Sequence, residues 1–140
     1  MTREPIVAAL FAKLASVPGL LTTSRVFRHF AEVPAADQPA LYLAPYAQFA
    51  VRTRGLPTKW TVDFRAFIYI SRETSTVPDT VLNQVLDAIE LALAPATAAE
   101  VQTLGGLCDH AWIEGDIQTD IDTLGSQLLC VVPIRLLVTT

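Results

Sequence analysis

The sequence predicts an α+β fold, in which an antiparallel sheet of about 4–6 strands carries two main helices packed on one face. Two amphipathic helical patterns flank a strand with strict two-residue alternation, and two further long strands end the chain. Most strands follow one another through turn signals rather than through helices, which favours antiparallel pairing. Because 140 residues is the length of one domain, we expect residues 1–140 to fold as a single unit.

The first predicted helix begins near Thr2, which is placed to cap it, and ends at Pro18-Gly19. Apolar residues recur on one face of this helix, at Ile6, Val7, Leu10, Phe11 and Leu14. Glu4 and Lys13 interrupt the apolar stretch, so the pattern indicates a helix rather than a secretory signal peptide.

The next segments are short and rich in turn signals. Ser24 to Phe30 is basic, β-branched and aromatic, and it is interpreted as an edge strand, followed by a loop over Glu32 to Gln38. Pro39 to Pro45 is typical of a short strand with its first proline at the start. Tyr46 to Trp60 contains several basic residues, and Gly55-Leu56-Pro57 marks its tip, so we expect a basic hairpin there.

The clearest strand pattern covers residues 60–71, where apolar side chains occupy every second position. These apolar residues are Trp60, Val62, Phe64, Ala66, Ile68 and Ile70. Phe67 and Tyr69 lie on the otherwise polar side. Their position indicates that the outer face of the strand becomes covered at that point.

A second helix is predicted after this strand and before Pro95, with a loop over Ala94 to Ala99. Thr76 and Asp79 have the spacing of a capping box, with aspartate in place of the usual glutamate. The residues predicted to be buried on this helix are Leu82, Val85, Leu86, Ile89 and Leu93.

Two long strands are predicted over Gly106 to Thr119 and Ser126 to Val138, joined by an acidic turn over residues 120–125. Pro133 lies inside the last strand. Because proline has no N–H to donate, we expect that strand to be at an edge or bulged at this residue. Pro133 and Arg135 also break the longest apolar stretch, so no membrane-spanning segment is predicted.

Charge is divided unevenly along the chain. The formal net charge of -4 argues against a duplex-DNA-binding domain, whose surface is normally basic. Residues 1–72 contain nine Lys/Arg and four Asp/Glu, a net +5, whereas residues 73–140 contain one and ten, a net -9. The two halves of the chain thus have opposite net charges.

Cys108 and His110 are the residues that most resemble a reactive pair, because they share one face of a predicted strand. They could form a nucleophile dyad or contribute two ligands to a metal. Zinc requires at least three protein ligands, and the other candidates are His29 and Cys130, so a packed thiol beside a surface or hydrogen-bonded histidine is favoured. We predict reduced, buried thiols, with a bridge between the cysteines possible only if their strands are neighbours. No catalytic, cofactor or metal site is predicted.

The acidic residues Glu114, Asp116, Asp120 and Asp122 could act as general acids or bind a hard cation. Their spacing lacks the glycine and the terminal glutamate of a calcium loop. A solvated or partner-facing acidic segment is therefore favoured.

The basic residues Arg52, Arg54 and Lys59, with Phe49 and Trp60 beside them, could bind single-stranded nucleic acid through charge and stacking. The acidic second half of the chain favours another interpretation, in which this basic loop meets an acidic protein surface.

The order of these segments resembles the tail-terminator (tail completion) family of long-tailed bacteriophages, which includes minor tail protein U and related head–tail joining proteins. The features that carry the resemblance are Arg25 after the opening helix, Gln38–Leu43, Gly55–Trp60, Ile68–Ile70, Leu82–Glu90, Thr103–Leu107, His110–Gly115 and Val132–Ile134. The resemblance implies a non-enzymatic subunit without a cofactor that forms a hexameric ring. In that family the ring caps the tail tube, stops its polymerisation and joins the head connector.

The resemblance also implies a location and partners. The protein is expected at the head-proximal end of the virion tail, after assembly in the host cytoplasm, with the tail tube protein and a connector or stopper protein as partners. Genomic DNA would pass through the lumen without specific binding, and no membrane is involved.

The residues predicted to contact a subunit or partner are Arg52, Arg54, Lys59, Glu114, Asp116, Asp120, Asp122, Phe67 and Tyr69. The basic residues are expected to meet an acidic partner, and the acidic ones to face the lumen or a neighbour. Phe67 and Tyr69 belong to a surplus of apolar side chains that an obligate oligomer would bury. The alternatives are another head–tail component (a connector stopper, an adaptor or a tail tube subunit), a small thiol enzyme and a nucleic-acid-binding module.

Overall fold

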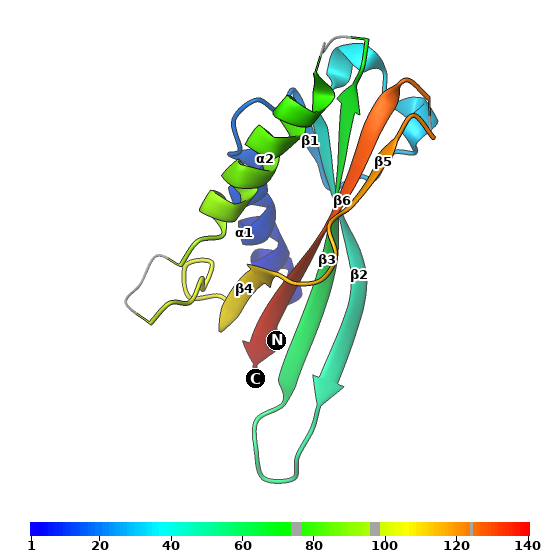
Figure 1. Ribbon diagram of the computed structural model, residues 1–140. Coiled ribbons are helices and arrows are strands. Elements are labelled where there is room, and N and C mark those ends of the chain that lie inside the picture. Colours follow the sequence, from blue (N-terminus) through cyan, green and yellow to red (C-terminus); the bar gives the residue numbers. More distant parts are fainter. Residues whose placement is uncertain (74–76, 96–98, 124) are drawn as a thin grey trace.

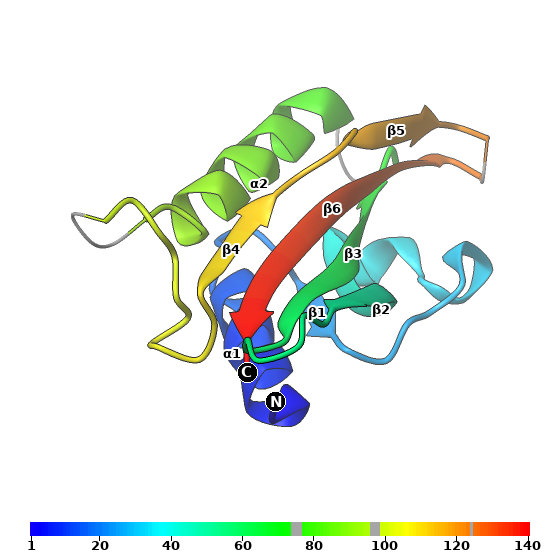
Figure 2. The same cartoon turned by 90° about the horizontal axis from the view of Figure 1, so that it is seen from below.

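The computed structural model describes residues 1–73, 77–95, 99–123 and 125–140. In this part of the chain, two α-helices lie against one face of a six-stranded sheet, so the predicted α+β class is confirmed (Figures 1 and 2). The helices are α1 (Arg3–Ala15) and α2 (Pro78–Ala92), with two short 3-10 turns, η1 (Phe30–Glu32) and η2 (Ala35–Asp37). The strands are β1 (Thr22–Ser24), β2 (Ala40–Val51), β3 (Lys59–Ser71), β4 (His110–Ile113), β5 (Gln118–Ile121) and β6 (Gln127–Thr139).

The sheet has the order β1-β2-β3-β6-β4, and β5 pairs with β6 beside β4. The short β1 runs parallel to β2, whereas the other pairs are antiparallel. β3 and β6 pair over 13 residues each and form the centre of the sheet. Their apolar residues alternate as predicted, and one set faces the helices. That set consists of Val62, Phe64, Ala66, Ile68, Ile70, Leu128, Cys130, Val132, Ile134, Leu136 and Val138.

Both predicted helices are present and bury the predicted stripes. α1 packs against the sheet through Ile6, Leu10 and Leu14, which are spaced by four residues. Thr2 occupies the N-cap position of α1, but its side chain makes no capping hydrogen bond. The buried residues of α2 are Leu82, Val85 and Ile89, and Leu93 is buried just after its end. The predicted capping residue Thr76 lies outside the described residues.

A second, smaller core lies on the sheet face opposite the helices. Its buried residues are Val33, Ala40, Tyr42 and Tyr69, with Phe30, Phe67 and Leu129 packed against them. Residues 25–37 cover this part of the sheet (Figure 2), as the apolar residues on the outer side of β3 had indicated.

The edge strand predicted over Ser24 to Phe30 is therefore wrong beyond its first residue. β1 ends at Ser24, whose hydroxyl oxygen accepts a hydrogen bond from the Val26 N–H at 2.9 Å and turns the chain away from β2. Phe27 then packs edge-on against Phe67, with ring centroids 4.7 Å apart. This aromatic contact places residue 27 over the outer face of β3 instead of along the edge of β2.

The strand predicted over Pro39 to Pro45 is longer in the structure, because β2 continues to Val51. Its register with β3 shifts between Pro45 and Ala47, and this bulge carries the pairing past the proline. Residues 52–58 then form the predicted hairpin loop, with Gly55 at positive φ. Figure 1 shows the hairpin extending beyond the ends of both helices.

The long strand predicted over Gly106 to Thr119 is also wrong, because it consists of a turn and two short strands, β4 and β5. The two strands are separated opposite Pro133 of β6. The Pro133 carbonyl accepts a hydrogen bond from the Glu114 N–H at 3.3 Å, but its nitrogen has no proton to continue the ladder. Gly115, at φ +111, makes the turn away, and a Cβ there would lie 3.4 Å from the proline ring.

Candidate interaction surface

The projecting β2–β3 hairpin combines exposed apolar and basic side chains. We call the following residues the hairpin surface: Tyr46, Phe49, Val51, Arg52, Arg54, Leu56 and Lys59. Tyr46, Phe49 and Leu56 are each about two-thirds exposed, at 64%, 66% and 66%. Large apolar side chains gathered in this way on one projecting element are typical of a protein–protein contact.

The geometry of β2 explains this exposure. β1 pairs with β2 only at residues 40–42, and among the described residues no other strand lies on that side. The outer edge of β2 is therefore open from residue 43 to residue 51. Phe49 and Val51 pair with Thr61 and Lys59 of β3, so their side chains lie on the face opposite the helices. Residues 25–37 do not reach this end of the sheet (Figure 1).

The predicted basic residues Arg52, Arg54 and Lys59 lie together at the end of the hairpin, and all three are exposed. Within the part of the chain that the structure describes, none of them forms an ion pair. Their charges are thus available to a partner. The two aromatic residues predicted beside them differ in exposure. Phe49 is exposed, whereas Trp60 is partly buried under the Arg3 guanidinium.

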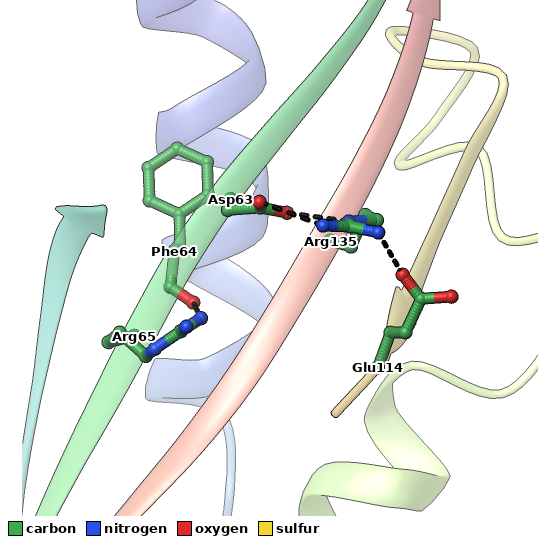
Figure 3. A network of polar contacts seen from close by, with 5 residues as sticks. All are labelled: Asp63, Phe64, Arg65, Glu114 and Arg135. Atoms are coloured by element: carbon green, nitrogen blue, oxygen red, sulfur yellow. Dashed lines mark hydrogen bonds and ion pairs between the residues drawn. The ribbon is translucent and has the colours of Figure 1, made fainter. Parts of the chain in front are cut away.

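A three-residue ion network crosses the sheet beside the hairpin (Figure 3). The guanidinium of Arg135 on β6 donates to both carboxylate oxygens of Asp63 on β3, at 2.8 and 3.0 Å. It also donates to Glu114, which follows β4. The hydrogen bond with Asp63 is the main cause of the raised pKa of Arg135. Arg135 is the only lysine or arginine after position 72. The network therefore pairs the one positive charge of the second half of the chain with carboxylates.

The four predicted acidic residues lie along the β4–β5 side of the sheet, but they fall into two kinds. Glu114 pairs with Arg135, and Asp122 pairs with Arg72. Asp116 and Asp120 are exposed, and within the described residues neither forms an ion pair. Asp116 and Asp120 are therefore the better candidates for contact with another molecule.

Phe67 and Tyr69 are covered by the chain itself. Tyr69 is only 2% exposed, and its hydroxyl donates to the Arg28 carbonyl at 3.2 Å. Phe67 is half-buried beneath Phe27. The ring of Tyr69 is thus not available to a neighbouring subunit, because residues 25–37 already occupy the place predicted for a partner.

Cys108 lies before β4 and is buried. Burial is the main cause that raises the pKa of its thiol to about 11, so the reactive thiolate is scarce at neutral pH. The imidazole Nδ1 of His110 accepts a hydrogen bond from the Gln102 N–H at 3.1 Å, and its ring stacks on Trp112. This arrangement is that of a packed thiol beside a structural histidine.

Cys108 and Cys130 are both free. Asp109, next to Cys108, bonds to Leu137 near the end of β6, whereas Cys130 lies near its start. At about 3.3 Å per strand residue, this separation exceeds the reach of a disulfide.

Among the described residues, no group of three or more histidine, cysteine, aspartate or glutamate side chains is placed to hold a metal ion. No α-helix in the described ranges is long and apolar enough to cross a membrane.

Tyr46, Val51 and Leu56 of the hairpin surface are not among the predicted contact residues. The strand predicted over Pro39 to Pro45 stops short of Val51, although apolar residues alternate at Ala47, Phe49 and Val51.

These features define an α+β fold with one helix-covered sheet face and a projecting hairpin. No protein-family model matches the chain, and no curated protein does. It is similar in fold to a solved chain described as the virion of a native gene transfer agent (GTA) particle, with a TM-score of 0.57 and 11% identity, over 99% of this chain and 100% of that chain. A second solved chain, whose description states no function, has a TM-score of 0.54 and 17% identity, over 97% and 96%.

Proposed function

We propose that this protein is a virion structural subunit, and more specifically a tail terminator that forms a ring on the end of a tail tube. The observation that carries the proposal is the hairpin surface, which projects from the fold with exposed apolar residues and with basic residues that form no ion pair among the described residues. The fold shared with a chain of a gene transfer agent virion supports an assembly role. The resemblance of the sequence to tail terminators supports the particular role.

The two unlike edges of the sheet support ring formation. The β2 side carries Arg3, which forms no ion pair among the described residues, whereas the β4–β5 side carries Asp116 and Asp120. A ring interface joins one patch of a subunit to a different patch of the next, and opposite charges on the two patches favour that arrangement. The proposed ring has six subunits and closes, so polymerisation stops there.

The hairpin surface contacts the acidic surface of the tube or of the next subunit. Arg52, Arg54 and Lys59 steer and orient the contact, while Phe49 and Leu56 supply the apolar area that stabilises it. A connector or stopper protein binds the opposite end of the ring. With a net charge of about -4 per subunit, the ring would not hold DNA that passes through its lumen.

The open edge of β2 favours one alternative, a tail tube subunit, because an unpaired strand edge promotes repeated association. A tube subunit forms filaments as its concentration rises, whereas a terminator stops at single rings. Electron microscopy of the purified protein over a range of concentrations distinguishes them.

Charge reversal of the hairpin tests the proposed contact. We expect R52E/R54E to abolish ring formation or docking on tail tubes, since it places like charges against the acidic partner. The matched control is K13E/R28E, which makes the same change in net charge away from the hairpin. Assembly of R52E/R54E that equals the wild type would refute the assignment. Salt-sensitive DNA binding that the double variant loses would instead support a nucleic-acid-binding module.

A further inference from the structure

An apolar groove opens between α1 and the sheet at the β2 side. It is lined by Ile6 and Val7 of α1, Leu43 and Pro45 of β2, and Val62 and Phe64 of β3. Its volume of about 160 Å³ is close to the roughly 150 Å³ cavity that holds a small apolar molecule such as benzene. The groove is open because β1 ends at Ser24 and leaves β2 uncovered beyond residue 42.

The rim of this groove is basic. Arg25 pairs with Glu4 at 2.5 Å, so its charge is matched within the chain. Arg3 donates to the amide oxygen of Gln48 at 2.8 Å and lies over the Trp60 ring, 4.9 Å from its centroid. Among the residues that the structure describes, no carboxylate pairs with Arg3. The groove thus suits an apolar side chain with an acidic neighbour.

A segment with an apolar side chain beside an acidic one lies at the opposite edge of the same sheet. Ile117 is 42% exposed and directly follows Asp116, in the connection between β4 and β5. This connection lies outside the strand ladders, and the side chains of Asp116 and Ile117 are both exposed.

The strand registers place the groove and this segment at similar levels of the sheet. β4 ends opposite Ile134 of β6 and β5 begins opposite Val131, so Ile117 lies between those levels. Ile134 pairs with Phe64 of β3, which lines the groove. Within one chain, β3 and β6 lie between the groove and Ile117. A contact of Ile117 with the groove therefore has to be made between two copies of the chain.

We infer that Ile117 of one copy inserts into the α1–β2 groove of the next, with Asp116 pairing with Arg3 on its rim. This inference rests on the proposed ring and names the contact that holds it together. The contact is heterologous, so each subunit offers one groove and one insert.

Site-directed cross-linking tests the contact in the full-length protein. In V7C/I117C, a short bis-maleimide is expected to give a ladder of covalent oligomers on a denaturing gel, up to the size of the ring. The control is L91C/I117C, because Leu91 is 78% exposed on α2 and does not line the groove. Cys108 and Cys130 are buried in both variants and provide the same background.

A charge exchange provides the second test. We expect R3E and D116R each to raise the concentration needed for half-assembly several-fold, and R3E/D116R to restore it. I117S is expected to raise it about tenfold or more, since it removes one buried aliphatic side chain. If Arg3 acted only within its own chain, adding D116R to R3E would not restore assembly.

The outcomes separate the two proposals. Closed rings on electron micrographs, with no cross-linked ladder and no rescue by R3E/D116R, would overturn the groove contact and leave the ring intact. A monomer at every concentration would overturn both. A ladder with V7C/I117C and rescue by the charge exchange would support the contact.

Discussion

The thiol of Cys108 illustrates how burial sets the chemistry of individual residues in this protein. Burial is the main cause that raises its pKa to about 11, and the nearby carboxylate of Asp109 acts in the same direction. In an unfolded chain a thiol ionises near pH 8.5. The folded state therefore holds this proton more tightly than the unfolded state.

We predict an alkaline loss of stability from this group. The contribution of Cys108 is present below about pH 8.5 and is lost as the pH rises towards 11, because only the unfolded chain releases the proton in that range. Urea unfolding at several pH values measures this effect, and Cys108→Ala should show a shallower decline. Tyr42, Tyr69 and Cys130 also have raised pKa values, so part of the decline remains in the variant. Rapid reaction of native Cys108 with a thiol reagent at pH 7 would contradict this description and favour the thiol enzyme.

The Asp63–Arg135–Glu114 network allows a second residue-level prediction. The side chain of Asp63 is 17% exposed and accepts two hydrogen bonds, whereas that of Glu114 is 46% exposed. We expect Asp63→Asn to lower the free energy of unfolding by about 1–2 kcal/mol, and Glu114→Gln by no more than about 0.5 kcal/mol. Chemical denaturation measures both. Equal losses would contradict this and show that the Glu114 pair matters as much as the less exposed Asp63 pair.

Individual residues also show why the interaction surface could be predicted only in part from the sequence. The exposure of Arg52, Arg54 and Lys59 follows from a local turn signal, which a sequence shows directly. The pairing of Asp122 with Arg72 joins residues 50 positions apart in the chain, so no local pattern reveals that Asp122 is engaged.

Among the elements, those with a strong local period were predictable and those shaped by distant contacts were not. α1, α2, β3 and β6 each repeat their apolar positions over three or more periods. The division into β4 and β5 depends on Pro133, which lies in a different strand. The folding of residues 25–37 onto the sheet depends on Phe67, 40 positions after Phe27.

The packing of α2 on the sheet leads to a prediction at the element scale. Ile89 is fully buried, and we expect Ile89→Ala to lower the free energy of unfolding by about 2–5 kcal/mol through lost burial and a new cavity. Leu91, two residues along the same helix, is 78% exposed, so Leu91→Ala should change it by no more than about 0.5 kcal/mol. Thermal and chemical unfolding of the two variants provide the comparison. A large effect of Leu91→Ala would mean that its side chain is buried in an assembly.

On the scale of the whole molecule, part of the charge division of the sequence is found at the two edges of one sheet. Five basic residues of the first half lie at the β2 side and the hairpin, namely Arg3, Arg25, Arg52, Arg54 and Lys59, and the acidic segment from Glu114 to Asp122 lies on the β4–β5 side. The fold brings Arg72 and Arg135 to that acidic side, where they reduce its charge. Asp116 and Asp120 remain unpaired among the described residues, so the two sides are still complementary.

We propose that these complementary sides close a ring. Native mass spectrometry of the purified wild-type protein, with negative-stain images of the same sample, measures the number of subunits and the shape of that assembly. We predict a single assembly of six times the 15.2 kDa chain mass and closed rings of uniform diameter. A monomer at all concentrations, or filaments that lengthen with concentration, would contradict it.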